Sequence, residues 1–256
     1  MQVFQSTVYK FLMLVLIAVV FNSCREQAQN TTCGQVTIKF IPVWNGQVVT
    51  IDSIYTNSLN QRIRFENIAT YFSNIYIGNG IDSVLFSQVE LLQLLGGQAT
   101  VTKNMEPGTY SKLSFGLGIP PELNKNVDPS VYPNASPLSV QGSNGMFWYW
   151  NTGYIFFKLD GRTDLTGTSN APLLNTFAFH CGDDPLYRER AFSFATIHAE
   201  DLTSHEITVY VDMQLLMEGN NDPIDLSTDN ITHTTGNFAL AERVTNHFAD
   251  AFTVVP

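Results

Sequence analysis

The chain has 256 residues, with 23 acidic against 13 basic side chains and a formal net charge of −10 at pH 7. An acidic chain of this kind lacks the basic surface that nucleic-acid phosphates require, and charge does not draw it to anionic lipid head groups. Its length suits one sizeable core, and a single all-β domain of this size is ordinary.

The first segment, residues 1–23, is predicted to be a targeting signal. Lys10 precedes an apolar run from Phe11 to Phe21, which is too short to cross a bilayer as a helix. The run is followed by Asn-Ser-Cys, and a small residue directly before Cys24 is typical of a bacterial lipoprotein cleavage site. We therefore expect Cys24 to carry a lipid that anchors the protein to a membrane, with an ordinary secretory signal and a coincidental cysteine as the alternative. Either signal takes the protein out of the cytoplasm. We expect it in the bacterial cell envelope, as a periplasm-facing or surface lipoprotein.

Residues 24–34 are polar and show no periodicity, which is typical of a flexible tether. Two cysteines remain beyond Cys24, and export would permit a disulfide between them. A Cys33–Cys181 bond would fasten the tether to the domain. Alternatively, Cys181 keeps a free thiol and serves as a soft metal ligand. The sequence leaves both alternatives open.

Residues 35–256 are predicted to form one all-β domain, a β-sandwich of about eight strands. Apolar and polar residues alternate in segments rich in β-branched and aromatic side chains, and turn-forming residues separate these segments. The segments are 36–44, 63–77, 84–92, 109–119, 154–159, 177–180, 192–198 and 207–213.

Two segments depart from this alternation. Pro120 to Gly145 is rich in Pro, Asn and Ser and is predicted to be a long loop, a kind of segment that is more often functional than idle. Near the end of the chain, apolar side chains recur every three or four residues and predict one C-terminal amphipathic helix on the sheets. These side chains are Phe238, Ala241, Thr245, Phe248 and Phe252.

The stretch from Gly145 to Gly161 concentrates aromatic side chains. Trp148 and Trp150 are two residues apart, which on a strand places them on one face. The pair either packs in the core of the sandwich or forms an exposed platform for a glycan or another protein.

The five histidines are candidate ligands for copper or zinc, because both metals bind neutral imidazole. His180 ends a predicted strand, where a rigid scaffold opens into a loop. His233 lies shortly before the predicted helix. His205 is expected in an exposed turn and His247 at a helix edge. A purely structural role is the alternative for each of them.

Several segments together resemble the MbnP-like family of periplasmic copper-binding proteins, over nearly the whole mature chain. Gly145–Gly161 is similar to the family signature GMFWxWxxGYxFxKLEG, with Asp160 in place of Glu. Residues 68–77 resemble its tyrosine-rich YxSNI strand, and residues 179–182 resemble its YHIG element.

The resemblance implies an exported, largely β copper-binding protein. In some members a dihaem peroxidase-like partner oxidises a tryptophan to kynurenine, which helps to bind copper; by position this would be Trp148 or Trp150. The resemblance also implies His180 as a copper ligand and His233 as the next candidate, and Met146 could add a soft sulfur. Related chains often finish with His-x-His, which is absent here, so we expect one ligand of the family to be missing.

No enzyme motif stands out, neither a nucleophile elbow nor a phosphate loop nor His-Glu-x-x-His. We therefore expect a lipid-anchored copper-binding protein without catalytic activity of its own, with a dihaem peroxidase-like enzyme as a partner. The alternative is a surface lipoprotein that binds glycan or protein through its tryptophans.

Overall fold

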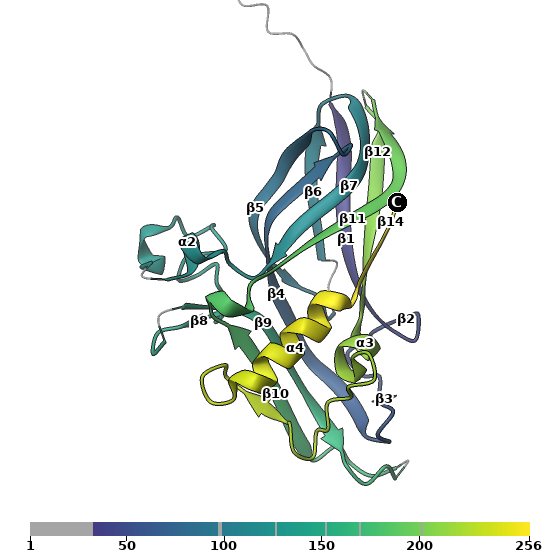
Figure 1. Ribbon diagram of the computed structural model, residues 1–256, viewed down its shortest axis with the longest axis vertical. Coiled ribbons are helices and arrows are strands. Elements are labelled where there is room, and N and C mark those ends of the chain that lie inside the picture. The colour runs from purple at the N-terminus through teal and green to yellow at the C-terminus, as the bar shows by residue number, and fades with distance from the viewer. Residues whose placement is uncertain (1–32, 97–98, 126, 152, 169, 201) are drawn as a thin grey trace, which may run out of the picture. The chain divides into compact units, whose positions relative to one another are not determined.

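The computed structural model describes residues 33–256 except 97–98, 126, 152, 169 and 201. This part of the chain is mainly β, as predicted, and forms two mixed sheets of five and nine strands (Figure 1). The predicted signal, Cys24 and most of the predicted tether lie outside the described residues. Among the helices that are described, none is long and apolar enough to cross a membrane.

The five-stranded sheet is centred on β1 (Gly34–Trp44). One side of β1 pairs in parallel with β12 (Ser204–Asp212), and β14 (Phe252–Val255) extends the sheet beyond β12. On the other side, β6 (Ala99–Met105) pairs with the beginning of β1, and β2 (Gln47–Val48) pairs with its end. The neighbour of β1 therefore changes partway along the strand.

The nine-stranded sheet is built around β4 (Arg62–Gly78), a strand of 17 residues. Its other members are β3 (Tyr55–Thr56), β5 (Ser83–Gln93), β7 (Gly108–Leu117), β8 (Phe147–Trp148), β9 (Gly153–Asp164), β10 (Asn175–Gly182), β11 (Arg188–Ala199) and β13 (Ile231–Thr232). The first part of β4 pairs with β9 and its second part with β7, on the same side of the strand. Figure 1 shows β4 running from the part with β5 and β7 to the part with β9 and β10.

The two sheets contact each other through buried phenylalanines. Phe40 of β1 and Phe72 of β4 have ring centroids 4.2 Å apart. Phe252 of β14 and Phe115 of β7 have ring centroids 5.4 Å apart. Large aromatic side chains contribute much of the area that a core removes from water. This cluster therefore forms a core shared by both sheets.

The strand count of about eight was too low. Each predicted segment overlaps a strand, but the sequence missed β6 and the two- to four-residue strands β2, β3, β8, β13 and β14. The described residues also form three helices where one was predicted: α2 (Pro121–Asn124), α3 (Met213–Glu218) and α4 (Phe238–Asp250). Asp212 is the N-cap of α3, and its carboxylate accepts from the backbone N–H groups of Gln214 and Leu215.

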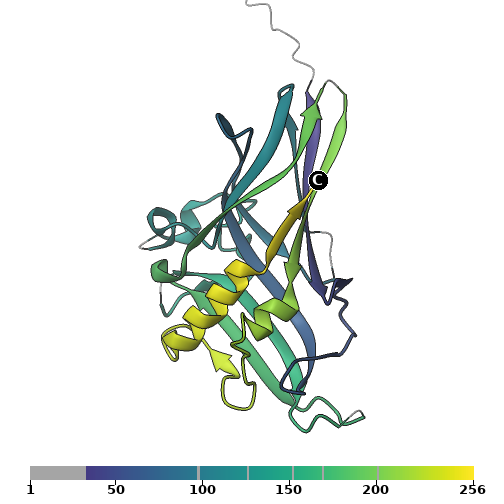
Figure 2. The ribbon, with the colours of Figure 1, turned by 45° about the vertical axis from the view of Figure 1, so that its right-hand side comes forward.

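The helix α4 is the predicted C-terminal helix. It buries Ala241, Thr245 and Phe248, as the spacing predicted. Phe238 is 40% exposed in its first turn, and Phe252 lies beyond the helix in β14, so the predicted apolar stripe is wrong at both ends. Figure 2 shows α4 across β9 and β10, whose inner faces it covers.

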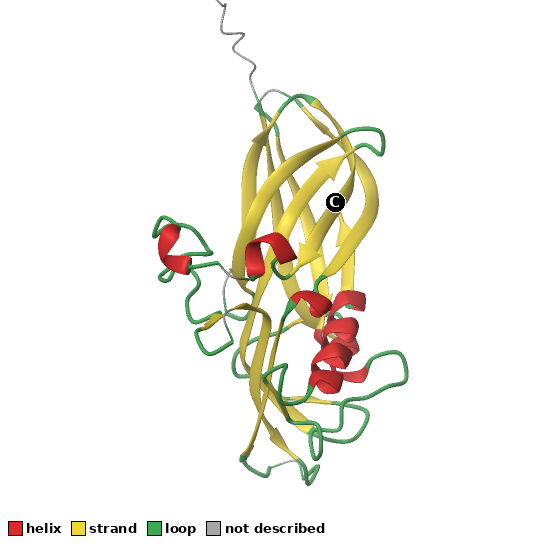
Figure 3. Ribbon diagram, turned by 60° about the vertical axis from the view of Figure 1, so that its left-hand side comes forward, coloured by secondary structure: helices red, strands yellow, loops and turns green. Residues whose placement is uncertain are grey.

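The predicted long loop joins β7 to β8 and contains α2 and a short 3-10 helix, η1 (Pro129–Val131). Loops, in green in Figure 3, make up most of this connection. Two tyrosines fasten it to the sheet: the hydroxyl of Tyr71 donates to the carbonyl of Pro137 at 2.8 Å, and that of Tyr154 donates to the carbonyl of Leu138 at 2.6 Å. The loop thus covers one end of the outer face of the nine-stranded sheet.

Candidate metal centre

The strands β9 and β10 present one face to α4 and the other outward. Phe157 of β9 is buried and stacks on Phe248 of α4, with ring centroids 4.0 Å apart. Successive side chains of a strand point to opposite faces. Lys158 and Asp160 of β9 and His180 of β10 therefore lie on the outer face, where each is only partly buried.

His180 and His233 lie side by side on this outer face. β13 runs parallel to β10 with Thr232 opposite Phe179, so the next residues, His233 and His180, come opposite each other. Their ring centroids are 4.7 Å apart, and the ring planes cross at 81°. The hydroxyl of Thr234 donates to the carbonyl of His180 at 3.1 Å and accepts from the N–H of Gly182 at 3.0 Å. These two bonds hold the loop that carries His233 against the end of β10.

Asp160 is hydrogen-bonded to the first of these histidines. Its Oδ1 lies 2.7 Å from Nε2 of His180, and its Oδ2 accepts from Nδ2 of Asn67 at 3.1 Å. Burial raises the pKa of Asp160, but the hydrogen bonds from His180 and Asn67 outweigh burial and leave the pKa below its usual value. The side chain is therefore a carboxylate at neutral pH.

His233 is held in its neutral form. Burial lowers the pKa of His233, and positive charge on His180 lowers it further, while the carboxylate of Asp160 acts in the opposite direction. A metal binds the lone pair of a neutral imidazole. The surroundings of His233 therefore favour the form that can act as a ligand.

Trp148 lies close to the same strand end. Its ring approaches Gly182 so closely that a Cβ at residue 182 would come within 2.9 Å of Cζ3 of Trp148 and 2.3 Å of the carbonyl oxygen of Tyr154. A glycine is therefore required at this position. Trp148 is buried, whereas Trp150 is 63% exposed, and their ring centroids are 5.5 Å apart. Trp148 therefore packs in the core, which was one alternative for the pair, whereas Trp150 faces outward, which was the other.

Met146 is buried in the wall of a neighbouring cavity. This cavity, of about 210 Å³, is also lined by Asn67 and Lys158, and neither His180 nor His233 is among its described lining residues. Lys158 is opposite His180 in the pairing of β9 with β10, so the cavity borders the histidine pair. The structure therefore places Met146 beside Lys158, one strand away from the imidazoles.

Cys181 lies on the inner face of β10, under α4. Burial raises the pKa of its thiol to about 12. The thiol stays protonated and faces away from His180, so it cannot share an ion with that side chain. Cys181 is also a free thiol, so the Cys33–Cys181 disulfide is not formed. Cys33 directly precedes β1 of the five-stranded sheet, whereas Cys181 lies in β10 of the nine-stranded sheet.

The remaining histidines lie elsewhere in the fold. The expectation that His205 is in an exposed turn is wrong: it lies in β12 opposite Val36, and its Nε2 is buried without a hydrogen-bond partner among the described residues. His247 lies in the last turn of α4, where Nδ1 donates to the carbonyl of Leu216 at 3.1 Å. His198 is exposed on β11.

The spacing of the two rings is compatible with a metal bound through two nitrogen ligands. In the part of the chain that the structure describes, no three His, Cys, Asp or Glu side chains gather closely enough to hold an ion by themselves. Two imidazoles that share an ion at about 2.0–2.1 Å have ring centres roughly 4–6 Å apart. The observed 4.7 Å lies within this range, and such an ion would keep open positions for further ligands.

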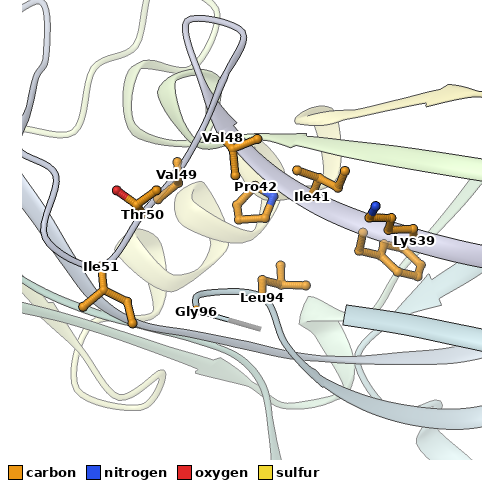
Figure 4. A pocket seen from close by; sticks show the side chains of 10 residues that line it. Lys39, Ile41, Pro42, Val48, Val49, Thr50, Ile51, Leu94 and Gly96 are labelled. Carbon is orange, nitrogen blue, oxygen red and sulfur yellow. The ribbon is translucent and has the colours of Figure 1, made fainter. Parts of the chain in front are cut away.

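A separate pocket of about 600 Å³ opens where the neighbour of β1 changes from β6 to β2 (Figure 4). Its lining is mainly apolar, with Ile41, Val48, Ile51 and Leu94 among the side chains. Lys39 is the ionisable residue among the described lining residues. None of the described lining residues therefore offers the imidazole or sulfur ligands that copper prefers.

A family model described as MbnP matches residues 33–235. The chain belongs to the MbnP family. The resemblance drawn from the sequence is thereby confirmed. The MbnP family is associated with copper and is generally described as copper-binding rather than enzymatic.

The fold is also similar to a solved structure, MbnP from Methylosinus trichosporium. The two share 15% sequence identity with a TM-score of 0.54, over 86% of this chain and 97% of that chain. At this identity the likeness shows a shared fold. No curated protein matches the chain.

Sequence reasoning missed part of the surroundings of this candidate site. Asp160 entered only as a replacement for Glu in the signature, and Asn67 did not enter at all. A signal was present in β9, where Lys158 and Asp160 alternate with Phe157 and Leu159. That alternation marks a polar outer face next to His180.

Proposed function

We propose that this MbnP-family protein binds copper between His180 and His233 and acts in copper handling, with no catalytic activity of its own. The observation that supports it best is the pair of perpendicular imidazoles, 4.7 Å apart between centroids, on the outer face of β10 and β13. The association of the family with copper supports the choice of metal.

The chemistry of the pair suits copper. Imidazole nitrogen is a common ligand for this metal, and the lowered pKa of His233 keeps that ring in its binding form. The acidic chain also raises the concentration of cations near its surface. Met146, one strand away, is too indirectly placed to be proposed as a ligand in the same arrangement.

Trp148 is the tryptophan better placed to border the copper. It packs against Gly182, two residues from His180, whereas Trp150 extends into solvent. We propose Trp148 as the residue converted to kynurenine, with a dihaem peroxidase-like enzyme as the oxidising partner. Peptide mass spectrometry of residues 145–161 measures this directly, and an unmodified Trp148 in copper-loaded protein from the native host would contradict it.

The copper site is tested by replacing its ligands one at a time. His180→Ala and His233→Ala should each weaken copper binding by more than about 100-fold. Removing a residue that merely hydrogen-bonds a metal ligand already lowers metal affinity by about 10–100-fold, so removing a ligand should cost more. Competition with a chromophoric chelator measures the affinity, and metal analysis after reconstitution measures the stoichiometry. The matched control is His198→Ala, which removes an exposed imidazole on β11 and should leave binding unchanged.

Absence of copper from the reconstituted parent protein, or an equal effect of His198→Ala, would contradict this function. The second candidate is then a surface lipoprotein that binds glycan or protein. The side chains of Tyr149 and Trp150, which are 67% and 63% exposed, favour that reading. Under it, Trp150→Ala abolishes glycan or protein binding while His180→Ala has no effect.

We also propose that a lipid on Cys24 anchors the protein in the bacterial cell envelope, periplasm-facing or at the surface. The apolar run before Ser23-Cys24 supports this placement. Cys24→Ala should move the protein from the membrane fraction to the soluble fraction or leave it as unprocessed precursor. Fractionation and immunoblotting measure both, and an unchanged membrane fraction with normal processing would rule the anchor out.

A further inference from the structure

Four neighbouring strands each contribute one polar side chain to a hydrogen-bonded row. Nε2 of Gln93, at the end of β5, donates to Oδ1 of Asn67 in β4 at 2.6 Å. Nδ2 of Asn67 donates to Oδ2 of Asp160 in β9 at 3.1 Å, and Oδ1 of Asp160 meets Nε2 of His180 in β10 at 2.7 Å. His233 lies next to the last member of this row.

The chemistry of its members fixes the direction in which this row donates. An ionised carboxylate has no proton to give, so Asp160 accepts at both oxygens. Asn67 must then turn its NH₂ group toward Asp160 and its carbonyl toward Gln93. By the same reasoning, His180 must carry its proton at Nε2, because a neutral imidazole has one N–H and one lone pair. The lone pair of His180 is thereby left at Nδ1.

We propose that Asp160 is a positioning residue that holds His180 as the Nε2–H tautomer, so that copper bonds to Nδ1 of His180. This inference rests on the proposed copper site. A carboxylate behind a metal-bound histidine orients the ring and raises the basicity of the opposite nitrogen. Asp160 is in the right place for both effects.

Asn67 and Gln93 make this orientation rigid. Asn67 occupies the second oxygen of Asp160, and Gln93 occupies the carbonyl of Asn67, so rotation of either group would break a hydrogen bond. The side chains of His180 and Asp160 are only 15% and 29% exposed, which limits exchange of their bond with water. The tautomer of His180 is therefore set through three strands before any metal arrives.

The first experiment uses metal-free protein. Long-range ¹H–¹⁵N NMR, at a pH where His180 is neutral, should show a protonated Nε2 and an unprotonated Nδ1. On loading with Cu(I), which is diamagnetic, the Nδ1 resonance should move most. An unprotonated Nε2 in the metal-free protein, or a dominant shift at Nε2 on loading, would overturn the inference. Neither reading requires a variant that might fail to fold.

The second experiment changes the carboxylate. Asp160→Asn replaces one of the two accepting oxygens with an NH₂ group, so the side chain no longer selects the Nε2–H tautomer of His180. Both tautomers should then be populated, and copper binding should weaken by about 10–100-fold. Asp160→Glu keeps the acceptor and should retain the Nε2–H tautomer. Glu66→Gln is the matched control, because it removes one charge near the same face but bonds Arg64 and Arg162 instead of His180.

Unchanged tautomer and unchanged affinity in Asp160→Asn would overturn the positioning role. The proposed function fails differently. If the parent protein shows the Nε2–H tautomer but Cu(I) moves neither ring, copper binding is refuted and the Nδ1 ligand is refuted with it. The metal-free spectrum and the copper titration therefore separate the two claims.

Discussion

At the scale of single residues, the pKa of His233 decides how far protons would compete with copper at the proposed site. We expect His233 in metal-free protein to titrate below the ordinary histidine value of about 6.5, since burial and positive charge on His180 both disfavour its protonated form. His180→Ala should raise the pKa of His233 by removing that charge. Asp160→Asn should lower it, because the carboxylate attracts the proton. NMR titration of the ring protons measures all three.

The sign of the effect on stability follows from the same shift. The folded pKa of His233 lies below the unfolded pKa, so the unfolded chain takes up its proton first as the pH falls. The free energy of unfolding contributed here is therefore complete above about pH 6.5 and is lost as the pH falls toward the folded pKa. A midpoint for His233 at or above the ordinary value, or shifts of equal sign in the two variants, would contradict the assignment.

The sequence indicated candidate ligands for the proposed site, but it did not indicate the residues that contact them. His180 and His233 could be chosen among the five histidines because one ends a predicted strand, the other precedes the predicted helix, and both lie where the family resemblance places functional residues. Asp160 could not be paired with His180, because that contact depends on which strands are neighbours and in what register. His205 shows the opposite error: a polar Leu-Thr-Ser-His-Glu segment suggested a turn, yet pairing with β1 draws it into β12.

At the scale of elements, α4 is the cover of the inner face of β9 and β10. Phe248 stacks on Phe157, so Phe248→Ala should lower the free energy of unfolding by about 3–5 kcal/mol through the cavity it leaves. Phe238→Ala on the same helix is the control. Its side chain is 40% exposed, and the change should stay within roughly 1 kcal/mol. Urea denaturation compares the two.

An equal loss for the two variants would mean that α4 packs through its first turn as strongly as through its middle. A loss confined to Phe248→Ala should also loosen β9 and β10, the strands that carry Asp160 and His180. Copper affinity measured in that variant should therefore fall at temperatures near its unfolding midpoint and should be unchanged at temperatures far below the midpoint.

Elements with a strong period were predictable, and those defined by pairing were not. The sequence located β4 and β5 within one residue of their ends, because apolar, β-branched and aromatic residues recur along each segment. Strands of two residues, such as β8 and β13, have no period to detect. β13 matters most among them, since its pairing with β10 carries His233 to His180.

At the scale of the whole molecule, the sequence predicted a mainly β chain of the right family, but not the division into five- and nine-stranded sheets. That division follows from β4, which serves two sets of neighbours in succession. No local pattern in residues 62–78 announces the exchange of β9 for β7. Long-range pairing is settled by the folded chain as a whole, so single segments cannot reveal it.

The row from Gln93 to His180, with His233 beside it, also determines when the proposed site is completed during folding. Asn67 and Gln93 come from the first half of the chain, Asp160 and His180 come from the second half, and His233 comes from the last tenth. His233 reaches His180 only when β13 docks beside β10. If copper binds at the proposed site, a nascent or unfolded chain holds no copper centre, because metal binding is then coupled to completion of the fold. A protein that crosses a membrane before folding would arrive empty and collect its metal at its destination. Bound copper would then indicate that β13 had paired with β10.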